Sequence, residues 1–415
     1  MKNPTGHISI IRHWLSVIPA SVLLCTSCTT TGHEPRKFSG ATPLEWSQRL
    51  AASQMARHHG APKWDYTVGL FSLSLLKLNE QAPDPRYVKF AEDAVGSLVA
   101  TNGTIQGYKI EEYQLDALNP GKTLLALWKL TNAERYIKGA MLLRHQLDLQ
   151  PRTPDGGFWH KQRYPQQMWL DGIYMGAPFY AECAATRVFC ASRWDFDDVA
   201  KQIRLIDEHT YDAKTGLNYH GWDAMKTQPW ANPATGCSSN FWGRAEGWYA
   251  MALVDVLDYF PTDHPARPQI IATLQKLAAG VVKYQDGKTG LWWQVLDAGD
   301  RKGNYQEATA STMFVYALAK GVNRGYLSRA YVPAIEKGYA GILRNLIRDD
   351  GGEKWSLTKC CSVAGLGGSP SNGKMRDGSF DYYVGEPVGD NDLKGVGPFI
   401  LAGIEMEHLP RTNIQ

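Results

Sequence analysis

Residues 169–187 read WLDGIYMGAPFYAECAATR, an apolar run rich in Ala that follows Trp, Asp and Gly. The run is apolar on nearly every side, which predicts a helix enclosed by other parts of the protein. Further segments repeat the pattern, each with a loop of Trp, Tyr, Asp, Asn or Gly before an apolar run. They are residues 64–78, 115–130, 241–260, 305–323 and 389–406.

More amphipathic stretches lie between these segments, with polar positions at helical spacing. They begin near Pro43, Asp84, Asn132, Phe196, Pro265 and Ser328. Inner-type and outer-type helices thus alternate six times as a loose internal repeat, and six hairpins that close on themselves make an all-α (α/α)6 barrel. No linker interrupts residues 38–415, which predicts one domain there, with short hairpin strands at 156–160 and 290–297.

The start of the chain has a different composition. Basic residues precede an apolar run at 14–24, which is too short to span a bilayer and is typical of an export signal. We interpret residues 1–27 as a lipoprotein-type signal peptide, Cys28 as the lipidated residue and 28–37 as a tether. In lipoprotein signal peptides, Leu is usual at the third position before the cleavage site. Cys25 stands there in this sequence, so plain secretion stays open. The predicted location is the bacterial cell envelope, lipid-anchored in the periplasm or outer membrane.

The composition excludes several classes of protein. The net charge of +3 is small and no block of Lys and Arg is present, so nucleic acid is not an expected partner. No HExxH motif is present and no CxxC motif follows Cys28, and we expect neither a metal nor another cofactor. The 14 Trp and 20 Tyr include faces able to stack on sugars, although core packing explains most of them.

Two aspartates precede predicted inner helices and are the candidate catalytic residues. Asp171 is surrounded by apolar and aromatic residues, and such surroundings let a carboxyl keep its proton and act as an acid. Asp116 stands before the neighbouring inner helix, so the two carboxyls could meet, one ionised and one protonated. The alternative is that both aspartates only cap their helices.

Three more residues are candidate substrate contacts. His220, next to Gly and Trp, suits a ligand, but a structural histidine explains it equally well. Arg244 lies at a predicted helix start, where a cation opposes the helix dipole, so it needs an anionic partner. That partner is either a substrate carboxylate or a neighbouring acidic side chain. Trp248 follows one turn later.

Four motifs resemble those of the unsaturated rhamnogalacturonyl hydrolases, glycoside hydrolase family 105. They are MWLDGIYMGAPF from Met168, HGWD from His220, FWGRAEGWYAMALVDVL from Phe241 and ATASTMFVYALAKGVNRGYL from Ala308. The similarity runs from about Trp46 to His408, and the related unsaturated glucuronyl hydrolases share the barrel and the aspartates. The resemblance implies an (α/α)6 barrel without a metal or organic cofactor.

The resemblance also implies roles for individual residues. Asp171 corresponds to the general acid/base of the family and Asp116 to its second aspartate. The substrate contacts of the family correspond to His220, Arg244, Trp248, Met175 and Tyr66, and Trp169 lies in the same motif as Asp171. The implied reaction is hydration of the C4=C5 double bond of an unsaturated uronic acid at the non-reducing end of an oligosaccharide.

Three other functions stay open. An unsaturated glucuronyl hydrolase would act on fragments of ulvan or glycosaminoglycans. A conventional inverting glycosidase would use the two aspartates as acid and base. A lipid-anchored glycan-binding protein would need only the aromatic residues.

Overall fold

The structure is a computed structural model that describes residues 36–186, 189, 193–368 and 375–411. The predicted signal peptide, Cys28 and most of the predicted tether lie outside the described residues. Residues Arg36–Gln415 form one compact unit. Its described residues are mostly helical and contain only two-stranded sheets, which confirms the predicted all-α class.

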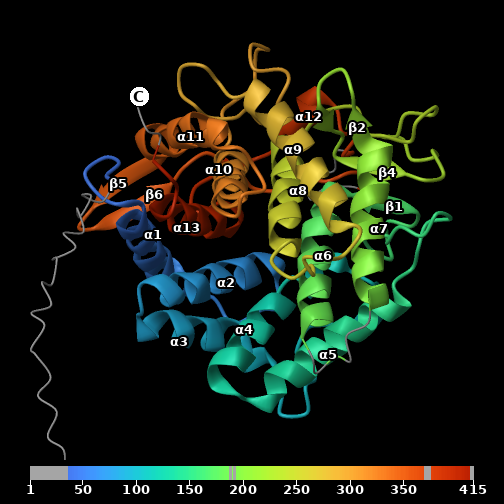
Figure 1. Cartoon of the computed structure of the whole chain (residues 1–415), viewed down its shortest axis with the longest axis horizontal. Coiled ribbons are helices and arrows are strands. Elements are labelled where there is room, and N and C mark those ends of the chain that lie inside the picture. Colours follow the sequence, from blue (N-terminus) through green and yellow to red (C-terminus); the bar gives the residue numbers. More distant parts are fainter. Residues whose placement is uncertain (1–35, 187–188, 190–192, 369–374, 412–415) are drawn as a thin grey trace, which may run out of the picture. The chain divides into compact units, whose positions relative to one another are not determined.

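Six inner helices form a closed ring. Each packs on the next along the chain, and the last packs on the first, as the (α/α)6 prediction requires (Figure 1). They are α2 (Tyr66–Gln81), α4 (Gly121–Thr131), α6 (Leu170–Ala185), α8 (Gly243–Val256), α10 (Ala308–Asn323) and α13 (Leu393–Glu407). All six predicted inner segments are therefore confirmed.

Six outer helices cover this ring, also as predicted. They are α1 (Pro43–Arg57), α3 (Pro85–Ala94), α5 (Glu134–Leu149), α7 (Arg193–Thr210), α9 (Arg267–Lys283) and α11 (Val332–Asn345). Local sequence explains where several begin. Thr42 and Glu45 form a reciprocal capping box at α1, and the Asp84 side chain accepts a hydrogen bond from the first turn of α3.

Helical hairpins give all inner helices one direction, so their N-termini lie at one end of the ring. Short antiparallel strand pairs form between the helices. They are β1 (Gln167–Trp169) with β4 (Gly221–Asp223), β2 (Tyr211–Asp212) with β3 (Leu217–Asn218), β5 (Ile347–Gly351) with β6 (Lys354–Leu357), and β7 (Cys360–Cys361) with β8 (Val388–Gly389). A short helix, α12 (Phe380–Gly385), follows β7.

The two predicted hairpin strands are wrong. Residues 156–160 contribute only one bridge, between Phe158 and Arg152. In 290–297, Val295 bridges to Trp242 and Trp293 bridges to Gln306. Phe158 pairs with Arg152, six positions earlier, through one isolated bridge, and Val295 and Trp293 pair with two separate segments, so neither stretch forms a regular strand.

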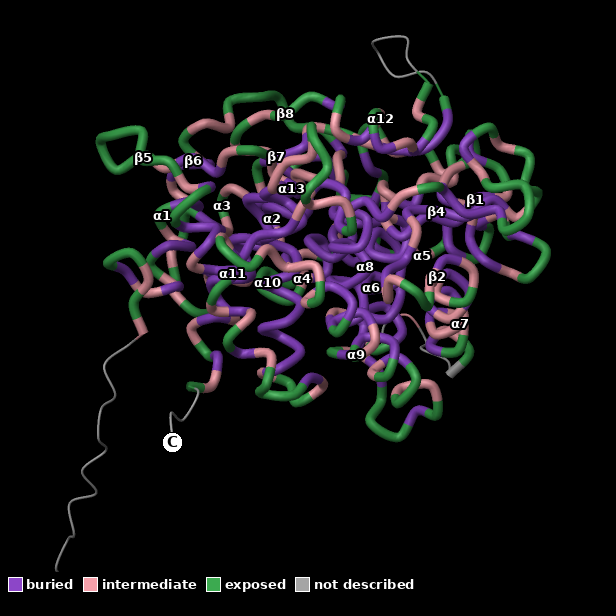
Figure 2. The backbone as a smooth tube through the Cα atoms, turned by 90° about the horizontal axis from the view of Figure 1, so that it is seen from above, coloured by how far each residue is buried: buried purple, intermediate pink, exposed green. Residues whose placement is uncertain are grey.

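The core lies in and around the inner ring, where Figure 2 shows continuous buried backbone. Trp242, Trp248 and Trp292 are its largest fully buried side chains. The cysteines of the described segments, Cys183, Cys237, Cys360 and Cys361, are buried free thiols. Within the described part of the chain, no helix is long and apolar enough to cross a membrane.

Candidate active site

Asp171 is the second residue of α6, but it does not cap that helix. The N-cap residue is Trp169, and no side chain caps the helix. Oδ2 of Asp171 lies 3.1 Å from Nε2 of His220, and the Asp171 side chain is 14 % exposed. No hydrogen-bond donor in the described residues is committed to Oδ2. The helix-cap alternative for Asp171 is therefore wrong, and this carboxyl keeps its hydrogen-bonding capacity.

His220 is held beside Asp171 by the β1–β4 pair. Trp169 pairs with Gly221, and the backbone N–H of Leu170 donates to the carbonyl of His220 at 3.0 Å. The imidazole is fully buried, and its Nδ1 lies 2.7 Å from the hydroxyl of Tyr383. A tyrosine hydroxyl can donate or accept a hydrogen bond. His220 can therefore keep a partner at Nδ1 while Nε2 either donates to Asp171 or accepts from it.

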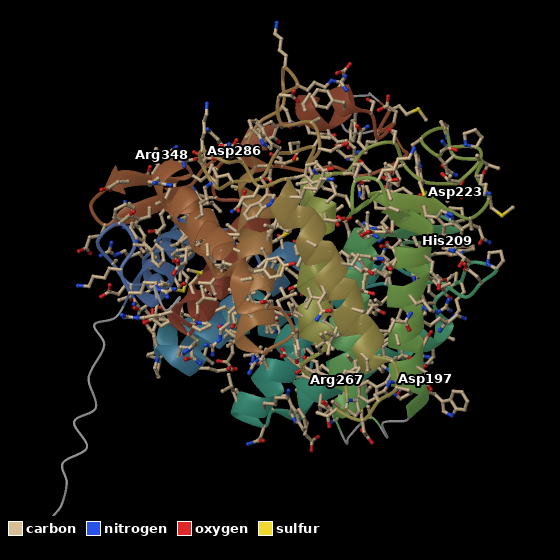
Figure 3. The ribbon with its side chains drawn as sticks, turned by 45° about the horizontal axis from the view of Figure 1, so that its top comes forward. Asp197, His209, Asp223, Arg267, Asp286 and Arg348 are labelled. Carbon is tan, nitrogen blue, oxygen red and sulfur yellow. The ribbon has the colours of Figure 1, made fainter. Side chains whose placement is uncertain are left out.

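The loop after His220 is fixed by Asp223 at the end of β4. Its Oδ2 accepts hydrogen bonds from the backbone N–H groups of Thr227 at 2.7 Å and Gln228 at 2.9 Å. Figure 3 shows Asp223 near His209, the histidine that stacks on Trp222 with ring centroids 3.6 Å apart. These contacts hold the β4 segment in place and so support the position of His220.

Asp116 has different partners, because it lies in the 3-10 helix Leu115–Leu118 and forms an ion pair. Its Oδ2 lies 2.5 Å from Nζ of Lys161, and its Oδ1 lies 3.6 Å from Nε2 of His160. Burial by itself would raise the pKa of Asp116, but Lys161 and His160 outweigh burial and lower the pKa below its usual value. Asp116 is thus an ionised carboxylate, and its helix-cap alternative is also wrong.

His160 lies between the two carboxyls. Burial lowers the pKa of His160 to about 4, although Asp116 and Asp171 both act to raise it. The imidazole is therefore neutral at neutral pH. Its ring stacks on Trp169 with centroids 4.4 Å apart. Because the charges of Asp116 and Asp171 both act on the pKa of His160, the two carboxyls lie at the same end of the barrel.

Tyr66 lies close enough to Asp116 and Arg244 for both charges to act on its hydroxyl. Burial raises the pKa of the Tyr66 hydroxyl well above its usual value; Asp116 raises it further and Arg244 lowers it. Trp248 is 1 % exposed, stacks on Tyr174 at 4.8 Å between centroids and meets Tyr66 edge-on at 6.4 Å. Trp248 therefore packs against both Tyr66 and Tyr174 from within the core. Met175 is also 1 % exposed, in the core one turn after Asp171.

Arg244, in the first turn of α8, is 2 % exposed. Its Nη1 donates to the backbone carbonyl of Cys361, and its guanidinium lies 4.6 Å from the ring centroid of Trp242. Burial alone would lower the pKa of Arg244, yet Cys361 and Glu307 hold it above the usual value. Nε has no hydrogen-bond partner in the described residues. Arg244 is therefore a fixed cation with unused donor capacity.

Sequence reasoning missed three residues at this end of the barrel. Lys161 and His160 follow the aromatic stretch GGFW, and a His–Lys pair there was the available signal. Tyr383 carries no local signal, because it is 163 positions from the histidine that it contacts. In the described part of the chain, no group of three or more His, Cys, Asp or Glu could hold a metal ion.

Comparisons with known proteins agree with this architecture. The family model for Glycosyl Hydrolase Family 88 matches residues 45–410. A glycoside hydrolase of family 105 from C. acetobutylicum ATCC 824 superimposes with a TM-score of 0.83 at 43 % identity, covering 87 % of this chain and 99 % of that one.

Two curated relatives extend the comparison. The 24.9 kDa protein in the picA locus of Rhizobium radiobacter is 40 % identical over 242 residues, which are 57 % of this chain and all of that protein. The unsaturated rhamnogalacturonyl hydrolase YesR of Bacillus subtilis is 26 % identical over 294 residues, 69 % of this chain and 77 % of that one. The chain therefore belongs to glycosyl hydrolase family 88, within the family 88 and 105 group of unsaturated uronyl hydrolases, and it is a glycoside hydrolase.

Proposed function

We propose that this hydrolase removes the 4,5-unsaturated uronic acid from the non-reducing end of lyase-generated fragments of rhamnogalacturonan. The observation that carries the proposal is the contrast between the two carboxyls. Asp116 is held ionised by Lys161, whereas Asp171 lies 3.1 Å from His220 and its Oδ2 accepts no hydrogen bond from the described residues. The rhamnogalacturonan assignment draws on the similarity to the Bacillus enzyme.

In the first step, Asp171 acts as a general acid. The C4=C5 bond of the unsaturated ring is an enol ether, because C5 carries the ring oxygen. Asp171 gives its proton to C4, and the ring oxygen donates electron density to C5, which forms an oxocarbenium-like cation. The ionised Asp116 lies at the same end of the barrel and stabilises this developing positive charge.

In the second step, Asp171 acts as a general base. It accepts a proton from the water molecule that attacks C5, so a hemiketal forms and the carboxyl returns to its starting state. Breaking the C5 to ring-oxygen bond gives a ketone at C5 and a hemiacetal at C1. That hemiacetal releases the remaining sugar as an alcohol and leaves an open keto-uronate. One water molecule is consumed and no other reactant is needed.

His220 and Tyr383 support both proton transfers. When Asp171 is ionised, His220 donates to it through Nε2 and accepts from Tyr383 at Nδ1. When Asp171 is protonated, His220 accepts from it and donates to Tyr383. The 2.7 Å contact at Nδ1 permits both arrangements, and Nε2 lies 3.1 Å from Oδ2, where the two atoms form no hydrogen bond in the described structure and would align as the proton moves.

The substrate carboxylate has a natural partner in Arg244, whose Nε has no partner in the described residues. Trp169 and Tyr66 would border the unsaturated sugar. Trp248 and Met175, each 1 % exposed, would hold that border from behind.

The test is the ultraviolet absorbance of the conjugated unsaturated uronate, followed after the purified enzyme is added to lyase-digested rhamnogalacturonan. Loss of absorbance with release of a rhamnose-ended product supports the proposal. Loss only with fragments of ulvan or glycosaminoglycans keeps the mechanism and assigns a glucuronyl substrate. Activity restricted to saturated oligosaccharides would contradict the double-bond mechanism.

We also propose that the enzyme is exported and anchored through a lipid on Cys28. The support is the sequence alone, with its short apolar run before Ser27 and Cys28. Metabolic labelling with a radioactive fatty acid should mark the wild-type protein and leave the Cys28→Ser variant unlabelled. An unlabelled wild type found free in the culture medium would instead indicate plain secretion.

A further inference from the structure

A cavity of about 440 Å³ lies at the end of the barrel opposite Asp171. Most of its walls come from the later turns of the inner helices, including Glu80 on α2, Asp255 on α8 and Glu405 on α13, whereas Lys122 is the second residue of α4. Asp171, Asp116 and His220 do not line this cavity, so it is separate from the candidate active site. A volume of this size matches ordinary small-molecule sites, which are roughly 300–1,000 Å³.

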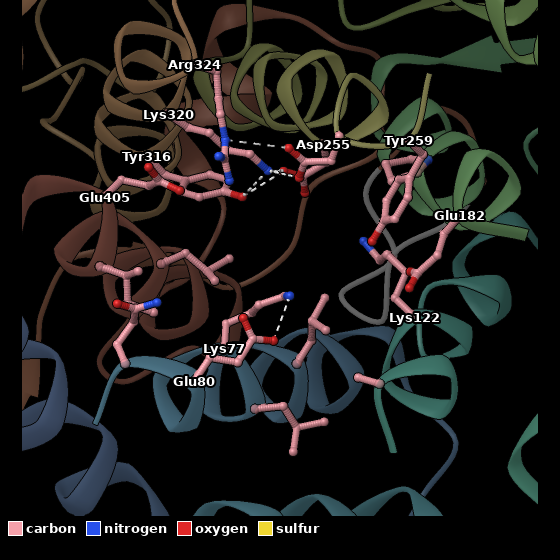
Figure 4. A pocket seen from close by; sticks show the side chains of 18 of the residues that line it. Lys77, Glu80, Lys122, Glu182, Asp255, Tyr259, Tyr316, Lys320, Arg324 and Glu405 are labelled. Carbon is pink, nitrogen blue, oxygen red and sulfur yellow. Dashed lines mark hydrogen bonds and ion pairs between the residues drawn. The ribbon is translucent and has the colours of Figure 1, made fainter. Parts of the chain in front are cut away.

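We call this the lower cavity, and the end of the barrel that holds it the lower end. Its lining is highly charged, and nearly every cation there has a carboxylate partner. The ion pairs are Lys77 with Glu80 at 2.9 Å, Lys129 with Glu182 at 2.6 Å, Lys320 with Asp255 at 2.7 Å and Asp258 at 2.6 Å, and Arg324 with Asp258 at 3.9 Å. Figure 4 shows the Lys320 ion pairs and the Lys77–Glu80 ion pair on facing walls, with Lys320 above and Lys77 below. These cations are already neutralised by protein groups.

Lys122 is the exception among the cations that line the cavity in the described residues. Its side chain is 4 % exposed, and Nζ has neither a hydrogen bond nor an ion pair there. Its close contact is the ring of Tyr174, 3.7 Å from Nζ to the centroid. Burial lowers the pKa of Lys122 to about 8, and Asp255 and Glu182 limit the decrease. Most molecules at neutral pH therefore carry a buried, unpaired ammonium, which is costly without an anion.

We propose that the lower cavity is a binding site for a small hydroxylated monocarboxylate, a sugar acid whose carboxylate pairs with Lys122. One unpaired cation calls for one negative charge. A dianion such as phosphate would place extra charge among Asp255, Asp258 and Glu182. Hydroxyl groups suit the remaining walls, because carboxylates and ammonium groups can each bond to a hydroxyl, and Oδ1 of Asn323 is buried without a donor.

The lower cavity is connected to the candidate active site through Tyr174. Trp248 stacks on the Tyr174 ring at 4.8 Å, so Lys122, at 3.7 Å from the same centroid, must occupy the opposite face. A ligand that draws Nζ of Lys122 away from the ring would thus change the support of Trp248. The binding site goes beyond the proposed function and does not depend on it.

The probe for this site is D-galacturonate, titrated by calorimetry into the full-length enzyme. Wild type and Asp171→Asn should bind it with similar affinity, whereas Lys122→Met should bind at least about tenfold more weakly, because a charge-assisted hydrogen bond is lost. Lys89→Met, on the exposed face of α3, is the matched control and should bind like wild type. D-galactose, which lacks the carboxylate, should bind wild type about tenfold more weakly than the probe.

Lys122→Met also has a stability readout. Because Met fills similar space without a buried charge, the variant without ligand should be at least as stable as wild type in thermal unfolding. Galacturonate should raise the unfolding temperature of wild type but not of Lys122→Met.

Four results would overturn the proposal. They are equal binding by wild type and Lys122→Met, loss of binding only in Asp171→Asn, tighter binding of inorganic phosphate than of galacturonate, and marked destabilisation by Lys122→Met.

Discussion

Where the inner helices begin, Asp171 lies 3.1 Å from His220, and its Oδ2 accepts no hydrogen bond from the residues that the structure describes. Where they finish, Lys320 lies 2.7 Å from Asp255 and 2.6 Å from Asp258. Both ends bury charged groups. The lower end pairs its described cations with carboxylates, except for Lys122, whereas the upper end pairs Asp116 with Lys161 and leaves Oδ2 of Asp171 without a hydrogen bond in the described residues. The difference indicates which charges serve the fold and which serve chemistry.

Asp171→Asn should have the largest effect on activity and little effect on the fold. Loss of a general acid and base should reduce kcat by about two to four orders of magnitude. The measurement is the decrease in ultraviolet absorbance of an unsaturated substrate, with circular dichroism to verify folding. Asp258→Asn at the lower end is the control and should keep most of the activity. Activity of Asp171→Asn close to wild type would remove Asp171 from the mechanism.

Lys320→Met should have the largest effect on stability. It removes a buried ammonium from Asp255, 13 % exposed, and Asp258, 29 % exposed, and losing these charge-assisted hydrogen bonds should cost about 1.5–3 kcal/mol. Denaturant titration measures this change in the free energy of unfolding. The matched control is Lys77→Met, since the Lys77–Glu80 pair is about half exposed and should contribute less than about 1 kcal/mol. Equal effects of the two substitutions would show that the lower network does not stabilise the fold.

Lys161→Met should have an intermediate effect that depends on pH. Without Lys161, burial dominates and raises the pKa of Asp116, so the acidic limb of the kcat/KM profile should move to higher pH. In wild type the pKa of Asp116 lies below its usual 3.8, so the pair stabilises the fold above that pH. This contribution is lost as the pH falls further. Thermal unfolding at falling pH should show the loss in wild type only, and an unchanged rate profile would contradict the ionised role of Asp116.

Tyr383→Phe should have the smallest effect. The variant removes the hydroxyl at Nδ1 of His220 but keeps the aromatic packing on Trp242. Loss of one hydrogen bond should reduce kcat by about fivefold to tenfold and alter its pH dependence. Steady-state rates across the pH range measure both. A uniform decrease at every pH would indicate packing alone, and an unchanged rate would exclude Tyr383 from supporting His220.

The sequence predicted every inner and outer helix of the barrel, because each depends on local periodicity and local capping. The apolar run after Trp169 and the Thr42 cap before α1 are examples, since both act within a few residues. The same reasoning failed for the strands at 156–160 and 290–297. A strand needs a partner, and the partners of Val295 and Trp293 lie in other segments.

The candidate site divides in the same way. Sequence alone predicted Asp171, Asp116, His220 and Arg244 as candidate site residues, but it did not predict the group that each one faces.

By itself the sequence determined where helices start, which faces are apolar and which charged residues lie at helix starts, because these depend on neighbours within a turn or two. Only the tertiary structure decided that Lys161 neutralises Asp116, that Tyr383 reaches His220 and that Cys361 receives Arg244. Those partners are 45, 163 and 117 positions apart, and the packing of the helical hairpins in the ring brings them together. Periodicity along the chain carries no record of which hairpins will face each other.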